Sequence, residues 1–597
     1  MHRLSLTAAL WIALLPPVAA ARAQAVETAP APSFYLPGAE DAARSPASTA
    51  ASGAQVATSA DPLASAAGVA MLQAGGSAAD AAAAMVIALG AVEPQSSGLG
   101  GGGFLVWYDA ASGRTFSLDA REKAPAAAGP TRFLKPDGTP MPFTQAVPGG
   151  YSVGVPGAIA LVAELHKRWG KRPWAELFAP AIRAAREGFP VSPRLNRFTE
   201  SRKAMLRQDP AAARIFLDPA GEPWPVGHVL RQPELAETLE LLAAQGPDAF
   251  YKGPIGGSVT TAVANAFSNP AQLTAEDLAA YRVGDRQPLC RPYRQWRICT
   301  MGPPSSGGIA VLQILLQLER FDLKSLGADN LLSQHLFAES QRLAYADREA
   351  YGADADFAPV PVEGLLSPAY IKARSALIRI DRAMADAPAG TPKGLPKRTA
   401  QRLADVPSTS HLAAADAAGN VATLTSTIEG PYGSGLVAAG IVLNNQLTDF
   451  DFAPVRADGE PAFNAVQPGK RPRSSMAPVI VYDRKGQPVA AFGAAGGATI
   501  IAQVAKAVIA HLDWGLSVED ALAAPQIIAD RSGLRYEADT RLGGQAAGLK
   551  ALGHQNVRAA VLPLKGNALA RVPGGWRGAA DPRSEGQAIA TGGNSTP

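Results

Sequence analysis

Residues 408–427 read Ser408-Thr409-Ser410-His411-Leu412-Ala413-Ala414-Ala415-Asp416-Ala417-Ala418-Gly419-Asn420-Val421-Ala422-Thr423-Leu424-Thr425-Ser426-Thr427, and this stretch decides the fold. It predicts a β-hairpin with one strand over 411–416, a turn over 417–420 and a second strand over 421–427. Because the turn is centred near Ala418, Thr427 is expected opposite Thr409 on the partner strand. A second hydroxyl at that place could hydrogen-bond the first.

The segment before the hairpin gives Thr409 its chemical interest. Residues 385–408 carry several prolines and basic side chains with almost no apolar periodicity, which predicts an exposed connector. Cleavage of the Ser408–Thr409 bond would leave a threonine at a new N-terminus. Such a residue carries both a nucleophilic hydroxyl and its own base, because an α-amino group titrates near pH ~8. Thr409 is therefore a candidate nucleophile.

Helices and strands are expected on both sides of the hairpin. Two alanine-rich helices are predicted over 61–93, broken at Gly75-Gly76, and a glycine run then leads into a strand over 104–108 and a second strand ending at 119–121. Helices are expected within 156–266 and over 309–350. Beyond the hairpin, strands are expected at 436–443, 476–483 and 488–493, followed by a helix over 499–512. This order indicates stacked sheets covered by helices.

The N-terminus resembles an export signal. His2 and Arg3 precede an apolar run, and Ala23-Gln24-Ala25 is a small-residue cleavage site, so residues 1–25 are interpreted as a signal peptide. Residues 26–57, rich in Ala, Pro and Ser, are expected to form a mobile leader, with the folded body beginning near Thr58. The mature protein is then expected outside the cytoplasm, in the periplasm or secreted.

Composition excludes several classes of partner. The net charge of the 597-residue chain is only +4 and no dense basic run occurs, so no nucleic-acid partner is expected. No stretch after the signal reaches the length of a membrane span. The seven histidines are scattered and form no metal-binding motif, so we expect no metal and no cofactor.

Only two cysteines occur, Cys290 and Cys299. If the segment between them is a hairpin turning at Arg294-Gln295, the two thiols face each other, and an oxidising compartment would allow a disulfide. Two free thiols on adjacent strands are the alternative.

Two familiar motifs are discounted. Residues 98–103 match Gly-x-Gly-x-x-Gly, but a helix precedes and a strand follows, the reverse of a dinucleotide site, which favours a close-packed backbone turn. Residues 150–154 match the Gly-x-Ser-x-Gly elbow of serine hydrolases, yet Pro-Gly pairs flank the motif where a strand and a helix are needed. A serine esterase acting through Ser152 is therefore a distant alternative.

The segment from Ser408 to Ala422 closely resembles the start of the small subunit of γ-glutamyltranspeptidases. Further stretches resemble signatures of that family in the same order: 99–104, 119–122, 303–308, 443–446 with 449–450, 470–472 with 474–476, 496–497 and 581–583. The resemblance covers residues 58–585. It implies an α+β fold, a four-layer αββα sandwich of the N-terminal-nucleophile hydrolase type, formed jointly by a large subunit, 58–408, and a small subunit, 409–597.

The resemblance also implies roles for individual residues. Thr409 would attack the γ-amide carbonyl of the donor to form a γ-glutamyl ester, Thr427 would orient it, and backbone N–H groups at Gly496 and Gly497 would stabilise the oxyanion. The donor's carboxylate and amino groups need partners of both signs. The substrate-binding candidates are Arg121, Ser474 and Ser475 for the carboxylate, and Glu429, Gln446 and Asp449 for the amino group.

The expected activity is transfer of a γ-glutamyl group from glutathione and related compounds to water, an amino acid or a peptide. The stretch between Asp449 and Lys470 is shorter than in relatives with a full lid loop and lacks their tyrosine, which would leave the acceptor side open. Two alternatives remain: a glutaryl-type cephalosporin acylase of the same fold, and an inactive exported binding protein. The amino-acceptor set argues against the first, and the intact nucleophile set argues against the second.

Overall fold

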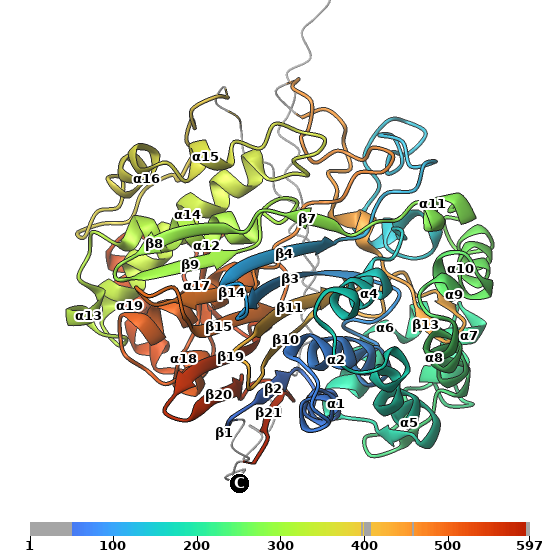
Figure 1. Ribbon diagram of the computed structural model, residues 1–597. Helices are drawn as coiled ribbons and strands as arrows, with labels where there is room; N and C mark the ends of the chain where they lie inside the picture. The colour runs from blue at the N-terminus through green and yellow to red at the C-terminus, as the bar shows by residue number, and fades with distance from the viewer. Residues whose placement is uncertain (1–49, 396–397, 399–407, 457–458, 593–597) are drawn as a thin grey trace, which may run out of the picture. The chain divides into compact units, whose positions relative to one another are not determined.

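A computed structural model describes residues 50–395, 398, 408–456 and 459–592 of the protein. The predicted signal peptide, residues 1–25, lies outside these residues, as do residues 26–49 of the predicted leader and residues 396–397 and 399–407 of the predicted connector. Figure 1 shows strands in the middle and helices on either side.

The strands form two large sheets of seven strands each, and all pairings within them are antiparallel. The first sheet has the order β1 (Ala50–Gly53), β20 (Gly575–Ala580), β19 (Lys565–Val572), β15 (Pro488–Ala495), β14 (Val479–Tyr482), β9 (Trp296–Thr300), β8 (Leu289–Tyr293). The second has the order β21 (Gln587–Ala590), β2 (Val56–Ser59), β10 (Ser410–Ala415), β11 (Val421–Thr427), β3 (Gly102–Asp109), β4 (Arg114–Ala120), β7 (Gly284–Arg286).

The leader prediction was wrong at its C-terminal end. Residues 50–53 form β1, which pairs with β20. Residues 56–59 form β2, which lies between β10 and β21 and pairs with both. Val56 and Ala57 are fully buried. Short strands of alanine, serine and glycine bury little side-chain surface and are held by backbone hydrogen bonds, so composition does not distinguish them from a linker.

The two sheets pack face to face, and alternate residues of each strand point to different layers. Val106 of β3 and Ala413 of β10 belong to the apolar cluster between the sheets, together with Ile480 and Leu569 of the opposite sheet. Leu412 of β10 faces the other way, into the cluster shared with the helices. His411 also lies between the sheets, and its ring contacts the backbone of Gly493 on β15.

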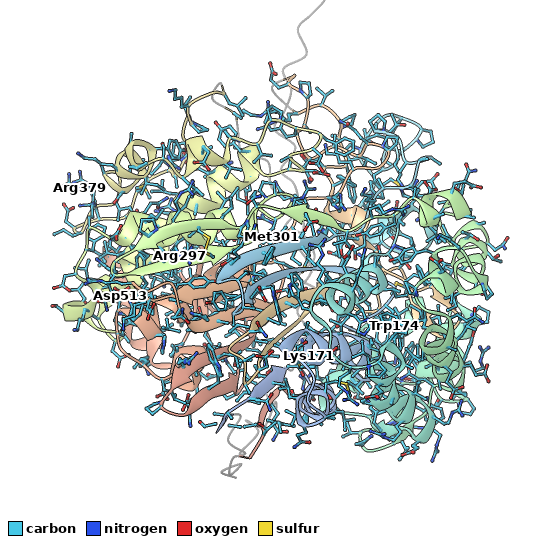
Figure 2. All side chains as sticks on the ribbon, in the orientation of Figure 1. Lys171, Trp174, Arg297, Met301, Arg379 and Asp513 are labelled. Carbon is cyan, nitrogen blue, oxygen red and sulfur yellow. A yellow bond between two sulfur atoms is a disulfide. The ribbon has the colours of Figure 1, made fainter. Side chains whose placement is uncertain are left out.

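One helical layer covers the β10–β11–β3 sheet and shares a single apolar cluster with it. Its helices are α1 (Pro62–Gln73), α2 (Ala78–Val92), α4 (Ala158–Trp169), α5 (Ala179–Glu187), α6 (Pro193–Leu206), α7 (Pro210–Phe216), α8 (Pro233–Gln245), α9 (Asp248–Tyr251), α10 (Pro254–Ala264) and α11 (Ala275–Ala279). Trp174, labelled in Figure 2, lies in this layer and donates through Nε1 to Leu242 O at 2.8 Å.

The second helical layer covers the other sheet through a separate apolar cluster. Its main helices are α12 (Gly307–Leu318), α14 (Leu331–Tyr351), α16 (Pro368–Ser375), α17 (Thr499–Leu512), α18 (Val518–Ala523) and α19 (Ala546–Ala551). The layers therefore stack in the order helices, sheet, sheet, helices. The protein has a mixed α/β fold with antiparallel sheets. In the described part of the chain, no helix combines the length and apolar character that a bilayer crossing requires.

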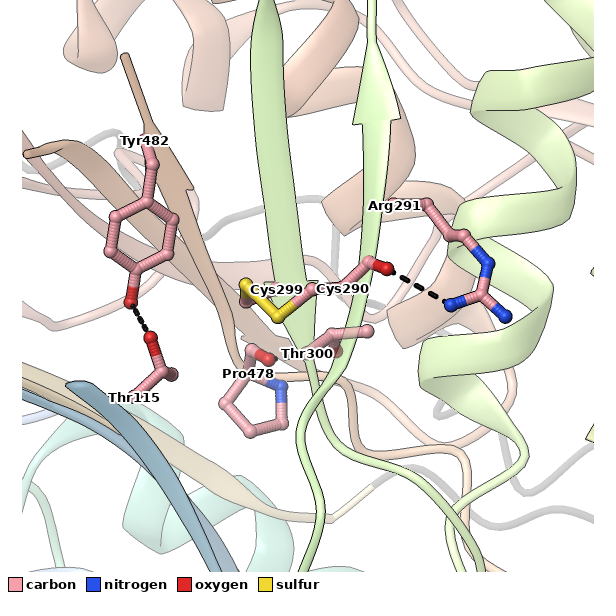
Figure 3. The surroundings of a disulfide bond; sticks show 7 residues. All are labelled: Thr115, Cys290, Arg291, Cys299, Thr300, Pro478 and Tyr482. Atoms are coloured by element: carbon pink, nitrogen blue, oxygen red, sulfur yellow. Dashed lines mark hydrogen bonds between the residues drawn. A yellow bond between two sulfur atoms is a disulfide. The ribbon is translucent and has the colours of Figure 1, made fainter. Parts of the chain in front are cut away.

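The cysteine hairpin has the predicted geometry. Strands β8 and β9 pair with Cys290 opposite Cys299 and turn at residues 294–295, and the two cysteines form a disulfide (Figure 3). Arg294 at the turn has φ 56° and donates through Nε to Asp513 Oδ1 at 2.9 Å. Asp513, labelled in Figure 2, is the C-cap of α17, so the hairpin is joined to the C-terminal end of that helix.

Candidate active site

The hairpin brings Thr409 and Thr427 together as the sequence predicts. Strands β10 and β11 pair with Ser410 opposite Ser426, and one step further the hydroxyls of Thr409 and Thr427 lie 3.2 Å apart. The Thr427 hydroxyl also donates to the Ser408 carbonyl at 3.2 Å, and the Thr409 hydroxyl contacts the same carbonyl oxygen. Both threonines are at most 4% exposed. Two hydroxyls therefore adjoin the peptide bond expected to be cleaved.

These threonines open into a pocket formed by segments far apart in the sequence. The C-terminal ends of strands β4 and β11 lie at the pocket, and helices α14 and α17 contribute side chains to its wall. The predicted residues that line it are Arg121, Ser408, Thr409, Thr427, Glu429, Gln446, Asp449, Ser474, Ser475 and Gly497, joined by Arg348, Arg473, Met476 and Ile500.

Arg121 provides a buried positive charge directly after β4. Its side chain is 2% exposed and pairs with Asp449, and its Nη2 also donates to the Arg473 carbonyl at 3.0 Å. Its Nε donates to the Pro472 carbonyl at 3.2 Å. The Glu122 carboxyl lies 3.9 Å from Nη1, and burial raises its pKa to about 8. Because that carboxyl is mostly protonated at neutral pH, Asp449 is the carboxylate that balances the guanidinium.

The expected amino-group acceptors Glu429, Gln446 and Asp449 all line the pocket. Gln446 and Asp449 lie on the 3-10 turn η4 (Gln446–Asp449), where Gln446 Nε2 donates to Asp449 Oδ2 at 2.7 Å. Glu429 accepts from Asn445 Nδ2, and its backbone N–H donates to Thr427 Oγ1 at 2.8 Å. Glu429 has φ 78°, a left-handed conformation that costs a non-glycine residue energy and recurs at functional sites.

Gly496 and Gly497 lie between the end of β15 at Ala495 and the start of α17 at Thr499, with φ values of 127° and 60°. Within the described residues neither N–H donates a hydrogen bond, and Gly497 lines the pocket. Backbone N–H groups at the start of a helix suit an accumulating negative charge.

Sequence reasoning missed a buried charge pair behind Thr409. Lys565 Nζ donates to both oxygens of Glu93 at 2.7 and 2.6 Å and to the Thr409 carbonyl at 3.1 Å. Ser410 Oγ donates to Glu93 Oε2 at 2.5 Å, and Ser97 Oγ donates to Ser410 Oγ at 2.9 Å. Burial lowers the pKa of Lys565 to about 8, while the Glu93 carboxylate opposes that shift. The pair fixes the backbone on the C-terminal side of the candidate nucleophile.

Both discounted motifs have structural roles. Adding a side chain at Gly100 or Gly101 would bring its Cβ to 2.1 Å from Val442 O or 2.0 Å from Thr427 O, so the glycine run is a close backbone contact. Ser152 is fully buried and donates to Val147 O at 2.6 Å and Gly149 O at 3.0 Å, away from the pocket.

Within the described residues, the pocket combines paired hydroxyls, charges of both signs and a neighbouring backbone N–H that donates no hydrogen bond, an arrangement suited to acyl transfer. The chain belongs to the γ-glutamyltranspeptidase family: the family's sequence profile, described as gamma-glutamyltranspeptidase, matches residues 64–591. The protein is an enzyme of this family.

Its relatives include hydrolases and acylases. The glutathione hydrolase proenzyme of Bacillus subtilis (strain 168) is 39% identical over 488 residues, which cover 80% of this chain and 81% of that protein. The acylase ACY 1 proenzyme of Pseudomonas sp. (strain SE83) is 36% identical over 540 residues, or 89% and 92% of the two chains. The crystal structure of a cephalosporin acylase from Bacillus halodurans matches with a TM-score of 0.79 at 28% identity, covering 91% of this chain and 96% of that one.

Proposed function

We propose that the protein is an autoprocessing γ-glutamyl transferase/hydrolase that acts on glutathione and related γ-glutamyl compounds through Thr409. The observation that carries this proposal is the hydroxyl pair of Thr409 and Thr427, 3.2 Å apart, beside the Ser408 carbonyl and within one pocket with Arg121 and Asp449. Relatives named glutathione hydrolase proenzymes support both the substrate and the precursor.

Processing would begin with Thr409 Oγ1 attacking the carbonyl carbon of Ser408. The C–N bond breaks as the C–O bond forms, the hydroxyl proton passes to the released amine, and water then hydrolyses the ester. Contacts of both threonine hydroxyls with the Ser408 carbonyl support this step. The products would be a large subunit ending at Ser408 and a small subunit, residues 409–597.

The freed α-amino group of Thr409 would then act as the base for its own hydroxyl. Thr409 Oγ1 attacks the γ-carbonyl of the donor, the N–H groups of Gly496 and Gly497 stabilise the oxyanion, and the protonated amine gives its proton to the leaving amine. Water or an amino-group acceptor releases the γ-glutamyl ester in the second half of the reaction.

Donor recognition follows from the charges. Arg121 and Asp449 form an ion pair in the structure and neutralise each other. A bound γ-glutamyl group brings a carboxylate for Arg121 and an ammonium for Asp449, so each residue exchanges one ionic partner for another. Glu429 and Gln446 add acceptors on the ammonium side, while Ser474 and Ser475 add hydroxyls on the carboxylate side.

A cephalosporin acylase is the second candidate, because the acylase relatives cover more of this chain than the hydrolase relatives do. A glutaryl donor has no α-amino group and would leave Asp449 paired only with Arg121. Comparing hydrolysis of a γ-glutamyl anilide with that of a glutaryl anilide separates the two: faster cleavage of the glutaryl compound would overturn the proposal.

We propose that the enzyme is exported to the periplasm or the medium, with its signal peptide removed. Intact mass and N-terminal sequencing of the purified protein test the processing step: the expected result is two chains, the smaller beginning Thr409-Ser410-His411. Thr409→Ala should remain one chain and be inactive. Ser152→Ala, which lies outside the pocket, is the control and should be processed and active. An active preparation made of a single uncut chain would refute the mechanism.

A further inference from the structure

The family-like segment at 303–308 lies outside the proposed chemistry and does not line the pocket itself, but it binds the turn that carries Ser474 and Ser475, which do. Ser306 N donates to Ser474 O at 2.9 Å, and Ser474 N donates to Pro304 O at 3.0 Å. Ser305 and Ser474 form a parallel bridge, and Ser305 Oγ donates to Met476 O at 2.5 Å. The turn before α12 is thereby bound along the turn that carries Ser474 and Ser475.

An arginine from a third segment joins these two turns. Arg348, near the end of α14, donates through Nη2 to Ser475 Oγ at 2.6 Å and through Nε to Ser306 Oγ at 3.1 Å. Ser306 Oγ in turn donates to the Ser474 carbonyl at 2.7 Å. Two of the three nitrogens of one planar guanidinium therefore each donate to a hydroxyl, Nε to Ser306 of one turn and Nη2 to Ser475 of the other.

The hydrogen bond from Arg348 leaves the Ser475 hydroxyl with its own proton to donate. A guanidinium only donates, whereas a hydroxyl both donates and accepts. Since Ser475 Oγ accepts from Arg348, its own proton must be donated elsewhere. The described residues offer it no acceptor, and Ser475 lines the pocket at 8% exposure. The O–H group is thus free to meet a ligand atom that accepts.

We propose that Arg348 is a positioning residue that, with Ser306, holds the Ser475 hydroxyl as a hydrogen-bond donor toward the α-carboxylate of the donor substrate. This inference rests on the proposed γ-glutamyl function. It predicts that Arg348 matters for donors that carry the α-carboxylate and matters little for donors that lack it. A lysine at this position has no planar fork and cannot hold both hydroxyls in the same way.

Kinetics with two donors test the assignment: γ-glutamyl-4-nitroanilide, and 4-aminobutyryl-4-nitroanilide, which lacks the α-carboxylate. Arg348→Met should raise KM for the first donor about 10-fold, the loss expected for a weakened hydrogen bond to a charged group, with a smaller change in kcat. Its effect on kcat/KM for the second donor should stay below about twofold. Arg348→Lys should fall between wild type and Arg348→Met, and Ser306→Ala should act in the same direction but less.

A double-mutant cycle with Ser475→Ala separates indirect action from direct contact. If Arg348 acts through Ser475, then Arg348→Met should cost nothing further once Ser475 is alanine. An equal cost in both backgrounds would mean that Arg348 binds the substrate itself and would overturn the proposal. Equal losses with both donors would mean a merely structural role for Arg348 and would overturn the proposal as well.

Arg342→Met is the matched control, because Arg342 lies on the same helix and donates to Glu339 Oε1 at 2.8 Å and Met384 O at 2.7 Å, away from the pocket. Both donors should be cleaved normally. If Arg348→Met does not fold, Arg348→Lys and Ser306→Ala still decide through the same KM comparison. Failure of wild type to cleave γ-glutamyl-4-nitroanilide would refute the proposed function instead.

Discussion

Replacing Glu93 by glutamine tests how strongly the fold depends on the charge buried behind Thr409. The carboxylate and Lys565 are at most 3% exposed in their side chains, with contacts of 2.6 and 2.7 Å. Glutamine keeps the shape but presents an N–H group to the ammonium, so Lys565 loses one acceptor and its counter-charge. Removing one partner of a buried ion pair costs about 3–5 kcal/mol, a large part of the roughly 5–15 kcal/mol that stabilises a typical domain.

The free energy of unfolding is measured by urea titration with tryptophan fluorescence, in a Thr409→Ala background that keeps one chain. Glu93→Gln should lower the midpoint strongly, and adding Lys565→Met should recover part of the loss because both charges are then absent. Asp248→Asn, at an exposed pair with Lys252, is the control and should change stability by less than about 1 kcal/mol. Additive losses in the double variant, or a Glu93→Gln loss no larger than the control, would refute the reasoning.

Three further outcomes are expected. Gly493→Ala would bring a Cβ to 2.0 Å from the His411 ring between the sheets, so it should lower the free energy of unfolding by about 1–3 kcal/mol or more in the same urea titration. Gly543→Ala is the control: its Cβ would meet no atom within 4 Å, so the free energy of unfolding should not change. Burial lowers the pKa of His411 in the folded protein to about 3, whereas in the unfolded chain it is about 6.5, so the imidazole of the unfolded chain is protonated first as the pH falls. The free energy of unfolding should therefore fall from about pH 6.5 toward pH 3, by up to ~1.4 kcal/mol per pH unit. His411→Gln should reduce this dependence on pH. Arg121→Lys should raise the donor KM about 10- to 100-fold without preventing processing; an unchanged KM would remove Arg121 from donor binding.

Local pattern predicted several elements of this fold, but the single strand expected over 436–443 was wrong: the segment forms two short paired strands, β12 (Val437–Ala438) and β13 (Ile441–Val442). The broken helix pair was expected over 61–93 and is found as Pro62–Gln73 and Ala78–Val92, and the helix expected over 499–512 is Thr499–Leu512. The hairpin register was confirmed because a four-residue turn fixes the pairing of every later residue. Strands β1 and β2 were missed because their pairing partners lie more than 350 residues away in sequence, at 575–580, 410–415 and 587–590.

The site was harder to predict where it depends on contacts between segments that are distant in the sequence. Arg348 lies in the last turn of a 21-residue helix, where a basic residue is ordinary, and nothing in its neighbours indicates a contact with Ser475. Glu93 follows α2 as an isolated acid, and its partner Lys565 begins β19. Such pairs join residues more than a hundred positions apart, 127 for Arg348 and Ser475 and 472 for Glu93 and Lys565, so a single sequence carries no local signal for them.

The cleavage proposed at Ser408–Thr409 would divide both sheets between two chains. Strands β2, β3, β4 and β7 precede the cut and β10, β11 and β21 follow it, while β1, β8 and β9 share the other sheet with β14, β15, β19 and β20. Folding of the precursor is a reaction of a single molecule, with its halves held at the high effective concentration that a covalent link provides. Reassembly after the cut would be second-order and would slow on dilution. Synthesis as one chain would therefore serve as an intramolecular chaperone used once, and a denatured mature enzyme would recover only at high protein concentration.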